Sequence, residues 1–409
     1  MSDDTETQHD SAYSWLRLAI SFAVGIVGNI GMWSIVVVLP DIQDEFGVGR
    51  ADVTFPVIGM MLGFALGNLF LGRAIDRWGI TPVLICSSIS GGISFAMSAW
   101  ASAILTVSFW HFFVGFAAAA CFGPLIADTS QWFLKRRGIA VAIAASSNYV
   151  SGAVWPPAVA WIMVDHGWRA AYLFLAVLVV VVVVPGAFLL RRKIDAETSA
   201  KATTVAASKA QAIAMKPQTL QWLLGLAGIG CCVAMSMPQV HIVALCIDRG
   251  FGAVAGAEML SLMLVGGVIS RLTFGALADR LGGMMTLLIG SFLQMVALCL
   301  FLINGGIVSL YLISLVFGLS QGGIVPSYAI IVREYMPPIE AGKRVGIVLS
   351  ITIAGMALGG WMSGWLYDVS GSYDLAIWNG VGWNLMNLAI IILILLRLGG
   401  GPKNVPVNA

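Results

Sequence analysis

Twelve long apolar runs are the feature that most restricts how this 409-residue chain can fold. A helix that crosses the hydrocarbon layer needs about 20 apolar residues, because its backbone polar groups must be satisfied within the segment itself. Runs of that length can be laid out at 16–39, 53–75, 81–101, 105–131, 138–163, 169–190, 220–246, 254–277, 284–303, 306–332, 345–367 and 375–397. We therefore predict an all-α membrane protein with twelve transmembrane helices.

The composition supports a membrane protein. Hydrophobic residues make up 59% of the chain and charged residues 10%, against roughly 45–50% and about 25% in soluble proteins. The net charge of +2 follows from membrane orientation, so the expected partner is the lipid bilayer and not nucleic acid. The six cysteines lie in apolar runs without a CxxC pair, which favours buried free thiols over a metal site.

Basic residues are divided unevenly between the two sides of the predicted membrane. The polar stretch 1–15 contains four acids and no cleavage-site pattern, so we expect a retained first helix and a cytoplasmic N-terminus. Alternating the spans from there leaves Arg50, Arg169 and Arg249 outside and Arg271 within a span, so eighteen of the 22 Lys and Arg residues are cytoplasmic. The positive-inside rule then predicts a multi-pass protein of the plasma (bacterial inner) membrane with both termini in the cytoplasm.

The chain also contains an internal repeat. The octapeptide from Gly72 to Gly79 recurs 203 residues later, from Gly275 to Gly282, and both copies read Gly-x-x-x-Asp-Arg-x-Gly. Looser echoes join 137–141 to 344–348 and 165–169 to 368–373. We predict two pseudo-symmetric six-helix bundles, 16–190 and 220–397, a cytoplasmic linker at 191–219, and cytoplasmic tails at 1–15 and 398–409. Repeated membrane bundles bind their ligand between the halves and expose it alternately to each side.

The two octapeptides resemble the loop signature of the major facilitator superfamily, and the resemblance covers essentially the whole chain. Within that superfamily, 132–138, 238–244 and Ser270-Arg271 before the second octapeptide look like the monocarboxylate transporter group, which includes bacterial oxalate/formate exchangers. The resemblance implies a secondary active transporter of a small, lactate- or pyruvate-like monocarboxylate. Protons are a candidate coupling ion, and an oxalate/formate-type or other organic-anion exchanger is the alternative.

Arg271 is the basic residue nearest the predicted midplane. It precedes Asp279 by eight residues, roughly 12 Å of helix in a layer whose half-thickness is about 15 Å. Burial there costs about 2.5–3.5 kcal/mol, and a carboxylate with two charge-assisted hydrogen bonds would offset it. A permanent ion pair is the alternative, although no acid follows Glu258 within that run.

The resemblance adds two expectations about Arg271. An arginine at the matching place is the anchor of the substrate carboxylate in the resembling transporters. Several of them also carry an aspartate one turn earlier, where it can take up a proton, but Gly267 stands at that position here. Because this chain has glycine where those transporters have an aspartate, its sequence leaves open whether transport is proton symport, anion exchange or facilitated diffusion.

Other polar residues are candidates for substrate binding or gating. Those expected near the depth of Arg271 or close to the central cavity are Asn29, Asn148, Tyr149, His241, Gln321 and Tyr328. Hydrogen bonds between helices are the competing role for each, and His241 is also a candidate pH-sensitive gate. We expect a second set of residues to control gating through ion pairs that form in one conformation only: Asp76, Arg77, Asp128, Asp279 and Arg280. A static turn built on Gly79 and Gly282 is the alternative, and Asp128 is also a candidate proton carrier.

Enzyme chemistry is not indicated. The sequence contains no HExxH, nucleophile elbow or phosphate-binding glycine loop, so we expect neither catalysis nor a cofactor nor a metal. A channel and a non-transporting receptor for an organic anion are the alternatives of other classes. A monomer is the default expectation for this architecture.

Overall fold

The computed structural model describes residues 10–133, 136–192, 216–303, 305–336 and 338–399. All regular elements in these ranges are helices. The predicted tails and linker lie largely outside the described residues, so their roles stay predictions.

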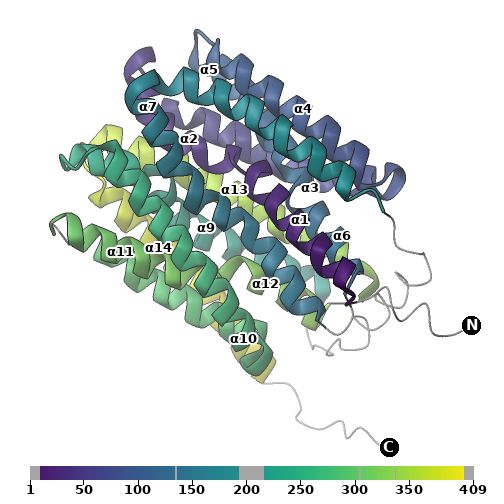
Figure 1. The fold of residues 1–409 in the computed structure, drawn as a ribbon. Helices are drawn as coiled ribbons and strands as arrows, with labels where there is room; N and C mark the ends of the chain where they lie inside the picture. The colour runs from purple at the N-terminus through teal and green to yellow at the C-terminus, as the bar shows by residue number, and fades with distance from the viewer. Residues whose placement is uncertain (1–9, 134–135, 193–215, 304, 337, 400–409) are drawn as a thin grey trace, which may run out of the picture.

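The helices fall into two groups that lie on opposite sides of the molecule, coloured purple to teal and green to yellow in Figure 1. The first group consists of α1 (Ala12–Gly28), α2 (Gly31–Phe46), the 3-10 helix η1 (Asp52–Thr54), α3 (Phe55–Trp78), α4 (Ile80–Ala99), α5 (Ile104–Ala120), α6 (Gly123–Gln131) and α7 (Arg137–Leu189). The second consists of α9 (Pro217–Asp248), α10 (Gly252–Leu300), α11 (Ile307–Gln321), α12 (Ile324–Tyr335), α13 (Pro338–Ser370) and α14 (Asp374–Gly399). We call these groups the N-half and the C-half.

Eleven stretches of the described residues are long and apolar enough to cross a membrane. One of them, Ile139–Leu189, contains 51 residues, roughly 75 Å of helix at about 1.5 Å per residue. Gly167 interrupts it with φ 74° and ψ 170°, so this stretch crosses twice. With the two parts of this stretch counted separately, the described helices include twelve stretches that are long and apolar enough to cross a membrane, and the all-α prediction is confirmed.

Glycines with positive φ form the sharp turns between consecutive spans. Gly79 and Gly282, the last residues of the two octapeptides, have φ 88° and 79° and ψ 167° and 162°. A residue with a side chain is strained at such a positive φ, whereas glycine adopts it freely. Gly167 and Gly371 repeat the pattern at the opposite end of the bundle with φ 74° and 73°. The sequence repeat is thus also a repeat of backbone conformation.

Three of the predicted runs contain a break near mid-span. The first divides between α1 and α2 at residues 29–30, the fourth between α5 and α6 at 121–122, and the tenth between α11 and α12 at 322–323. Pro124 and Pro326 follow the last two breaks, and proline cannot donate the backbone hydrogen bond that would continue the preceding helix. The breaks leave backbone carbonyls inside the membrane, and these need partners.

The two halves meet along α2 with α9, α3 with α13, and α7 with α10. On the last pair Tyr149 of α7 lies opposite Gly267 of α10, where an added Cβ would be 3.0 Å from the tyrosine ring. On α13, a Cβ added to Gly364 would be 2.5 Å from the carbonyl oxygen of Arg50. Glycine therefore permits the close approach of the halves at both places.

The two ends of the bundle differ in the segments that they contain. The linker end is where α1 begins and α7 ends, and the Arg50 end contains η1 and the connection between α13 and α14. These two names are used below.

Candidate functional site

Arg271 lies on α10 at the contact between the halves, and its side chain is only 9% exposed. Nη1 donates a hydrogen bond to the carbonyl oxygen of Ala145 at 2.6 Å, and Nε donates to the carbonyl oxygen of Gly322 at 3.4 Å. The guanidinium carbon is 4.1 Å from the centre of the Tyr149 ring. Its contacts within the described part of the chain include no acid. Two carbonyl dipoles, one from each half, and the Tyr149 ring of the N-half therefore offset part of this charge.

Tyr149 stands where an acid could otherwise pair with Arg271. Its ring packs against Gly267, one turn before the arginine, and a side chain at position 267 would displace it. The negative face of an aromatic ring attracts a guanidinium, although less strongly than a carboxylate does. Glycine at position 267 therefore makes room for the Tyr149 ring. Unlike an aspartate, this ring has no carboxyl group that could exchange a proton.

Asn29 and Asn148 are hydrogen-bonded to each other in the N-half. The Asn29 amide donates to the carbonyl oxygens of Gly25 at 2.7 Å and Cys121 at 3.2 Å, and the second carbonyl belongs to the break between α5 and α6. Asn148 Nδ2 donates to Asn29 Oδ1 at 3.2 Å. Trp33 Nε1 donates to the Asn148 carbonyl oxygen at 2.9 Å. These contacts support the broken spans and bring two predicted site residues together.

Gln321 forms a buried amide pair with Gln239 in the C-half. Gln239 Nε2 donates to Gln321 Oε1 at 3.0 Å, while Gln239 Oε1 and Gln321 Nε2 have no partner among the described residues. Whichever way the two amides are oriented, the pair retains one free donor and one free acceptor. Gln321 precedes Gly322, the residue whose carbonyl accepts from Arg271, so the pair adjoins the same helix break.

Two further candidates have their described partners elsewhere in the C-half. The Tyr328 hydroxyl donates to Asn387 Oδ1 at 3.0 Å, which joins α12 to α14. His241 Nε2 is 2.8 Å from the carbonyl oxygen of Gly360, and its Nδ1 is 3.1 Å from the Tyr373 hydroxyl. His241 is therefore connected to the Arg50 end, and its described contacts do not include Arg271.

Arg50, absent from the sequence-predicted site, joins the two halves at its own end of the bundle. Nη2 donates to Asp248 Oδ1 at 2.6 Å and Nη1 donates to the Tyr373 oxygen at 2.9 Å, while the Tyr367 ring centre lies 4.5 Å from the guanidinium. The carboxylate of Asp368 accepts the backbone N–H groups of residues 50 and 51 at 2.9 and 2.8 Å. We call these five residues the Arg50 cluster. The available sequence signal was that Arg50 is one of three basic residues on the sparsely charged side.

Asp128 pairs with Arg17 inside the N-half at the linker end. Arg17 is 1% exposed, and its Nη2 and Nε lie 2.7 and 3.0 Å from Asp128 Oδ2. Its Nη1 donates to the carbonyl oxygens of Leu190 and Arg192. The pair fastens α1, α6 and the end of α7 together. Arg17 was missed as a structural residue, although it is the only charged side chain in the run 16–39.

The octapeptide cations lie exposed at the linker end. The Arg77 guanidinium is 5.9 Å from the Trp78 ring centre, and Arg280 is exposed at the turn before Gly282. The side chains of Asp76 and Asp279 are outside the described part of the structure, so the gating role of the octapeptides stays a prediction. After the second turn, the Glu334 carboxylate accepts the Gly283 N–H at 3.0 Å. Burial raises the pKa of the Glu334 carboxyl, against the opposing effect of this hydrogen bond.

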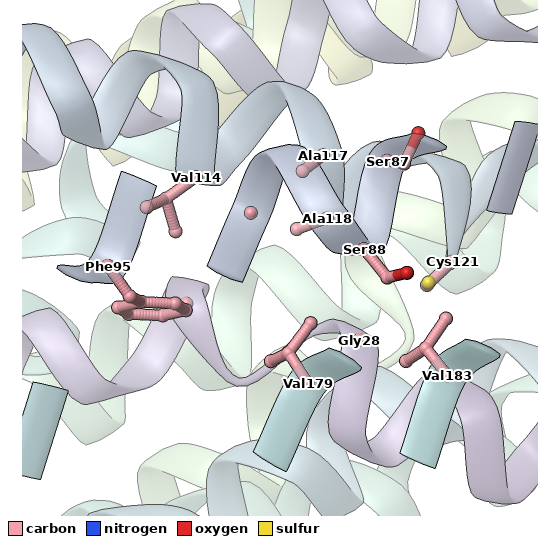
Figure 2. Close-up of a pocket in the computed structure, with 12 residues that line it drawn as sticks. Gly28, Ser87, Ser88, Phe95, Val114, Ala117, Ala118, Cys121, Val179 and Val183 are labelled. Carbon is pink, nitrogen blue, oxygen red and sulfur yellow. The ribbon is translucent and has the colours of Figure 1, made fainter. Parts of the chain in front are cut away.

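A small hollow in the N-half is distinct from the surroundings of Arg271. Figure 2 shows it between Phe95 and Val114 on one side and Val179 and Val183 on the other, with Cys121 nearby. Its volume is about 10 Å³, which is room for about one water molecule. An organic anion does not fit there. No metal-binding group of three His, Cys, Asp or Glu residues occurs in the described ranges.

Known proteins similar in sequence are transporters. Residues 21–303 and 242–408 match the Major Facilitator Superfamily. Human monocarboxylate transporter 11 is 26% identical over 379 residues, which cover 89% of this chain and 79% of that protein. The uncharacterized MFS-type transporter YcxA of Bacillus subtilis (strain 168) is 24% identical over 379 residues, which cover 89% of this chain and 90% of that protein.

Solved structures share the fold at low sequence identity. A bacterial homolog of the human lysosomal transporter Spinster, in an inward-facing and occupied conformation, has a TM-score of 0.70 and 13% identity over 95% of this chain and 96% of its own. A mutant of the nucleoside transporter NupG has a TM-score of 0.69 and 13% identity over 94% and 99%. With its repeated turns, twelve crossings and family match, the chain belongs to the major facilitator superfamily of secondary transporters, which are not enzymes.

Proposed function

We propose that this transporter carries a small organic monocarboxylate by alternating access, with Arg271 holding the carboxylate between the two halves. The proposal rests on the surroundings of the Arg271 guanidinium. It is buried against the carbonyl oxygens of Ala145 and Gly322 and the ring of Tyr149. These partners balance a full charge only in part. A carboxylate offers two oxygens for parallel charge-assisted hydrogen bonds, which match the guanidinium fork.

The same geometry connects binding to motion. Ala145 and Tyr149 belong to the N-half and Arg271 to the C-half, so the arginine is part of the contact between them. An anion that accepts its hydrogen bond from Nη1 competes with the Ala145 carbonyl oxygen for that donor. Binding therefore changes the contact energy between the halves at mid-depth, which is the requirement for a ligand to shift a two-state equilibrium.

The substrate class follows from the charge and the free polar atoms. A single deep cation favours a monoanion over a dianion such as oxalate. The free donor and acceptor of the Gln239 and Gln321 pair suit a hydroxyl or keto oxygen, as in lactate or pyruvate. The name of the human relative, monocarboxylate transporter 11, agrees with this class. Oxalate/formate-type exchange is the second candidate.

We assign the linker end, and with it both termini, to the cytoplasmic side of the plasma (bacterial inner) membrane. Arg17, Arg77, Arg192 and Arg280 all lie at that end, and basic residues are retained on the cytoplasmic side. The Arg50 end then faces outward. We keep a monomer as the expected assembly.

Uptake into proteoliposomes tests the proposal. Radiolabelled lactate, pyruvate, formate and oxalate are offered with and without an inward proton gradient and an internal counter-anion. We expect saturable lactate or pyruvate uptake by the natural chain. Loss of a hydrogen bond to a charged group, worth about 1.5–3 kcal/mol, should lower uptake by Arg271→Gln about tenfold to a hundredfold.

The matched control is Arg397→Gln, which alters an exposed arginine in the last turn of α14 and should transport normally. Normal uptake by a folded Arg271→Gln variant would contradict the anchor. Stimulation by the proton gradient would indicate symport, whereas oxalate uptake that requires internal counter-anion would favour the exchanger. Absence of uptake of all four anions by folded natural chain would contradict the proposed substrate class.

A further inference from the structure

His241, Tyr373 and Arg50 form a chain of hydrogen bonds whose directions follow from their chemistry. The Gly360 carbonyl oxygen can only accept, so His241 Nε2, 2.8 Å away, carries a proton. In the neutral ring Nδ1 is then an acceptor, and it receives the Tyr373 O–H at 3.1 Å. The Tyr373 oxygen accepts in turn from Arg50 Nη1 at 2.9 Å. With His241 neutral, each of these three hydrogen bonds therefore has one donor and one acceptor.

Tyr373 keeps its proton throughout the physiological range. Burial raises the pKa of its phenol well above the ordinary value, although the nearby Arg50 charge acts in the opposite direction. The hydroxyl thus always has one proton to donate. In the described structure the acceptor for that proton is the Nδ1 atom of His241.

A second proton on His241 disrupts this arrangement. Nδ1 would become a donor facing an oxygen that already accepts from Arg50, and the Tyr373 proton would lose its acceptor. The ring would also gain a positive charge close to the Arg50 guanidinium. Two like charges and an unpaired buried donor both weaken the contact between the halves.

The neighbouring acids do not provide a ready replacement partner. The charged and titratable groups that act on His241 are Tyr373, which it contacts, Arg50 from the segment after α2, and Asp368 on α13. Asp248 at the end of α9 and Tyr367 on α13 lie against Arg50. Asp248 Oδ1 already accepts from Arg50. Both Asp368 oxygens accept backbone N–H groups of residues 50 and 51. The negative charge of these two acids attracts a proton toward His241. Their described hydrogen bonds, however, are used in the contact between the halves at the Arg50 end.

We propose that His241 is a proton-binding site linked to the Arg50 end, which takes up a proton when this end is open and must release it before the Arg50 cluster forms. Acid on the outer side then favours the open arrangement. His241 acts as a sensor of external pH and does not carry its proton inward through the closed state. The inference uses the orientation given under Proposed function but is independent of which anion is transported.

Distances between spin labels across the Arg50 end measure this linkage. Ser102→Cys and Val308→Cys place labels at exposed positions of the N-half and C-half, in a chain whose six native cysteines are replaced. Double electron–electron resonance is recorded in lipid nanodiscs without substrate, from about pH 8 to about pH 5, the range in which histidine titrates. We expect the ratio of open to closed molecules to rise on acidification, by up to about tenfold per pH unit for one linked proton.

His241→Gln is the decisive variant, because its amide can donate to Gly360 and accept from Tyr373 but cannot take up the proton. Its distance distribution should not change with pH. His166→Gln removes an exposed histidine from the same end and should respond as the natural chain does. A natural chain without a pH response, or an acid response that persists in His241→Gln, would overturn the proposal.

Tyr373→Phe provides a second variant if His241→Gln does not fold. It removes the hydroxyl between His241 and Arg50 while keeping the ring, so the open fraction should already be raised at about pH 8, where histidine is neutral. An unchanged open fraction in this variant would also contradict the linkage. Since no substrate is present, these results are independent of whether the monocarboxylate assay succeeds.

Discussion

At the scale of single residues, Arg271 shows how a buried cation is stabilised without a permanent acid. Its depth in the sequence and the family resemblance both pointed to this arginine, because a charge in an apolar run is conspicuous. Tyr149 was placed at the same depth, but its stacking on the guanidinium depends on how α7 and α10 pack, which hydropathy does not specify. Arg17 and Arg50 were missed because their acids, Asp128 and Asp248, lie far away along the chain.

Replacement of Tyr149 by leucine should weaken substrate binding. The ring face holds the guanidinium in place, and a cation–π contact contributes about 0.5–2 kcal/mol, so the KM for uptake should rise about twofold to thirtyfold. Tyr149→Phe retains the ring face and should keep a KM close to that of the natural chain. Initial-rate uptake measurements on both variants check this. Equal KM values for Leu and Phe would indicate that the ring does not position Arg271.

At the scale of elements, the sequence predicted the number of crossings but not their interruptions. The runs that divide at residues 29–30, 121–122 and 322–323 were predicted as continuous spans, because hydropathy measures apolar content and not backbone continuity. Pro124, Pro326 and the Gly322-Gly323 pair were the readable signs. The polar side chains that meet the freed carbonyls, Asn29 and Arg271, were found for a different reason, as candidates for substrate contact.

Asp128→Asn should destabilise the N-half. Arg17 is buried and would lose its charged partner at the junction of α1, α6 and α7, and removal of one partner of a buried pair costs about 3–5 kcal/mol. Thermal unfolding in one detergent gives the comparison. The control is Glu45→Gln, which alters the pair between Arg169 and Glu45, 37% and 40% exposed; it should cost about 1 kcal/mol or less. Similar unfolding temperatures for the two variants would contradict a fastening role for Arg17.

At the scale of the whole molecule, the described polar contacts between the halves lie at mid-depth and at the Arg50 end. Ser261 donates to the Ala153 carbonyl oxygen and Arg271 to that of Ala145, while the Arg50 cluster joins the halves farther out. The described arrangement is therefore closed at the Arg50 end. The internal repeat predicted two related halves, and the bounds given to them stay a prediction. Which end is closed depends on contacts between distant residues and could not be predicted.

Gly364→Leu should hold the Arg50 end apart. A Cβ at this position already comes 2.5 Å from the Arg50 carbonyl oxygen, and backbone cannot move aside as a flexible side chain does. The labels at positions 102 and 308 should report a larger open fraction at about pH 8, where His241 is neutral, and uptake should fall. Gly382→Leu is the control, because a Cβ there meets nothing within 4 Å. Closure that persists in Gly364→Leu would contradict the tight contact.

The Arg50 and Asp248 side chains are 13% and 25% exposed, so dissolved ions reach the pair that joins the halves. The Debye length falls from about 10 Å at 0.1 M salt to about 3 Å at 1 M, and attraction between partly exposed charges falls with it. The contacts at mid-depth are shielded from such ions by the protein around them. With the orientation proposed above, the salinity of the surrounding medium should act on the Arg50 end, and this transporter should spend more of its time open to the outside in brine than in fresh water.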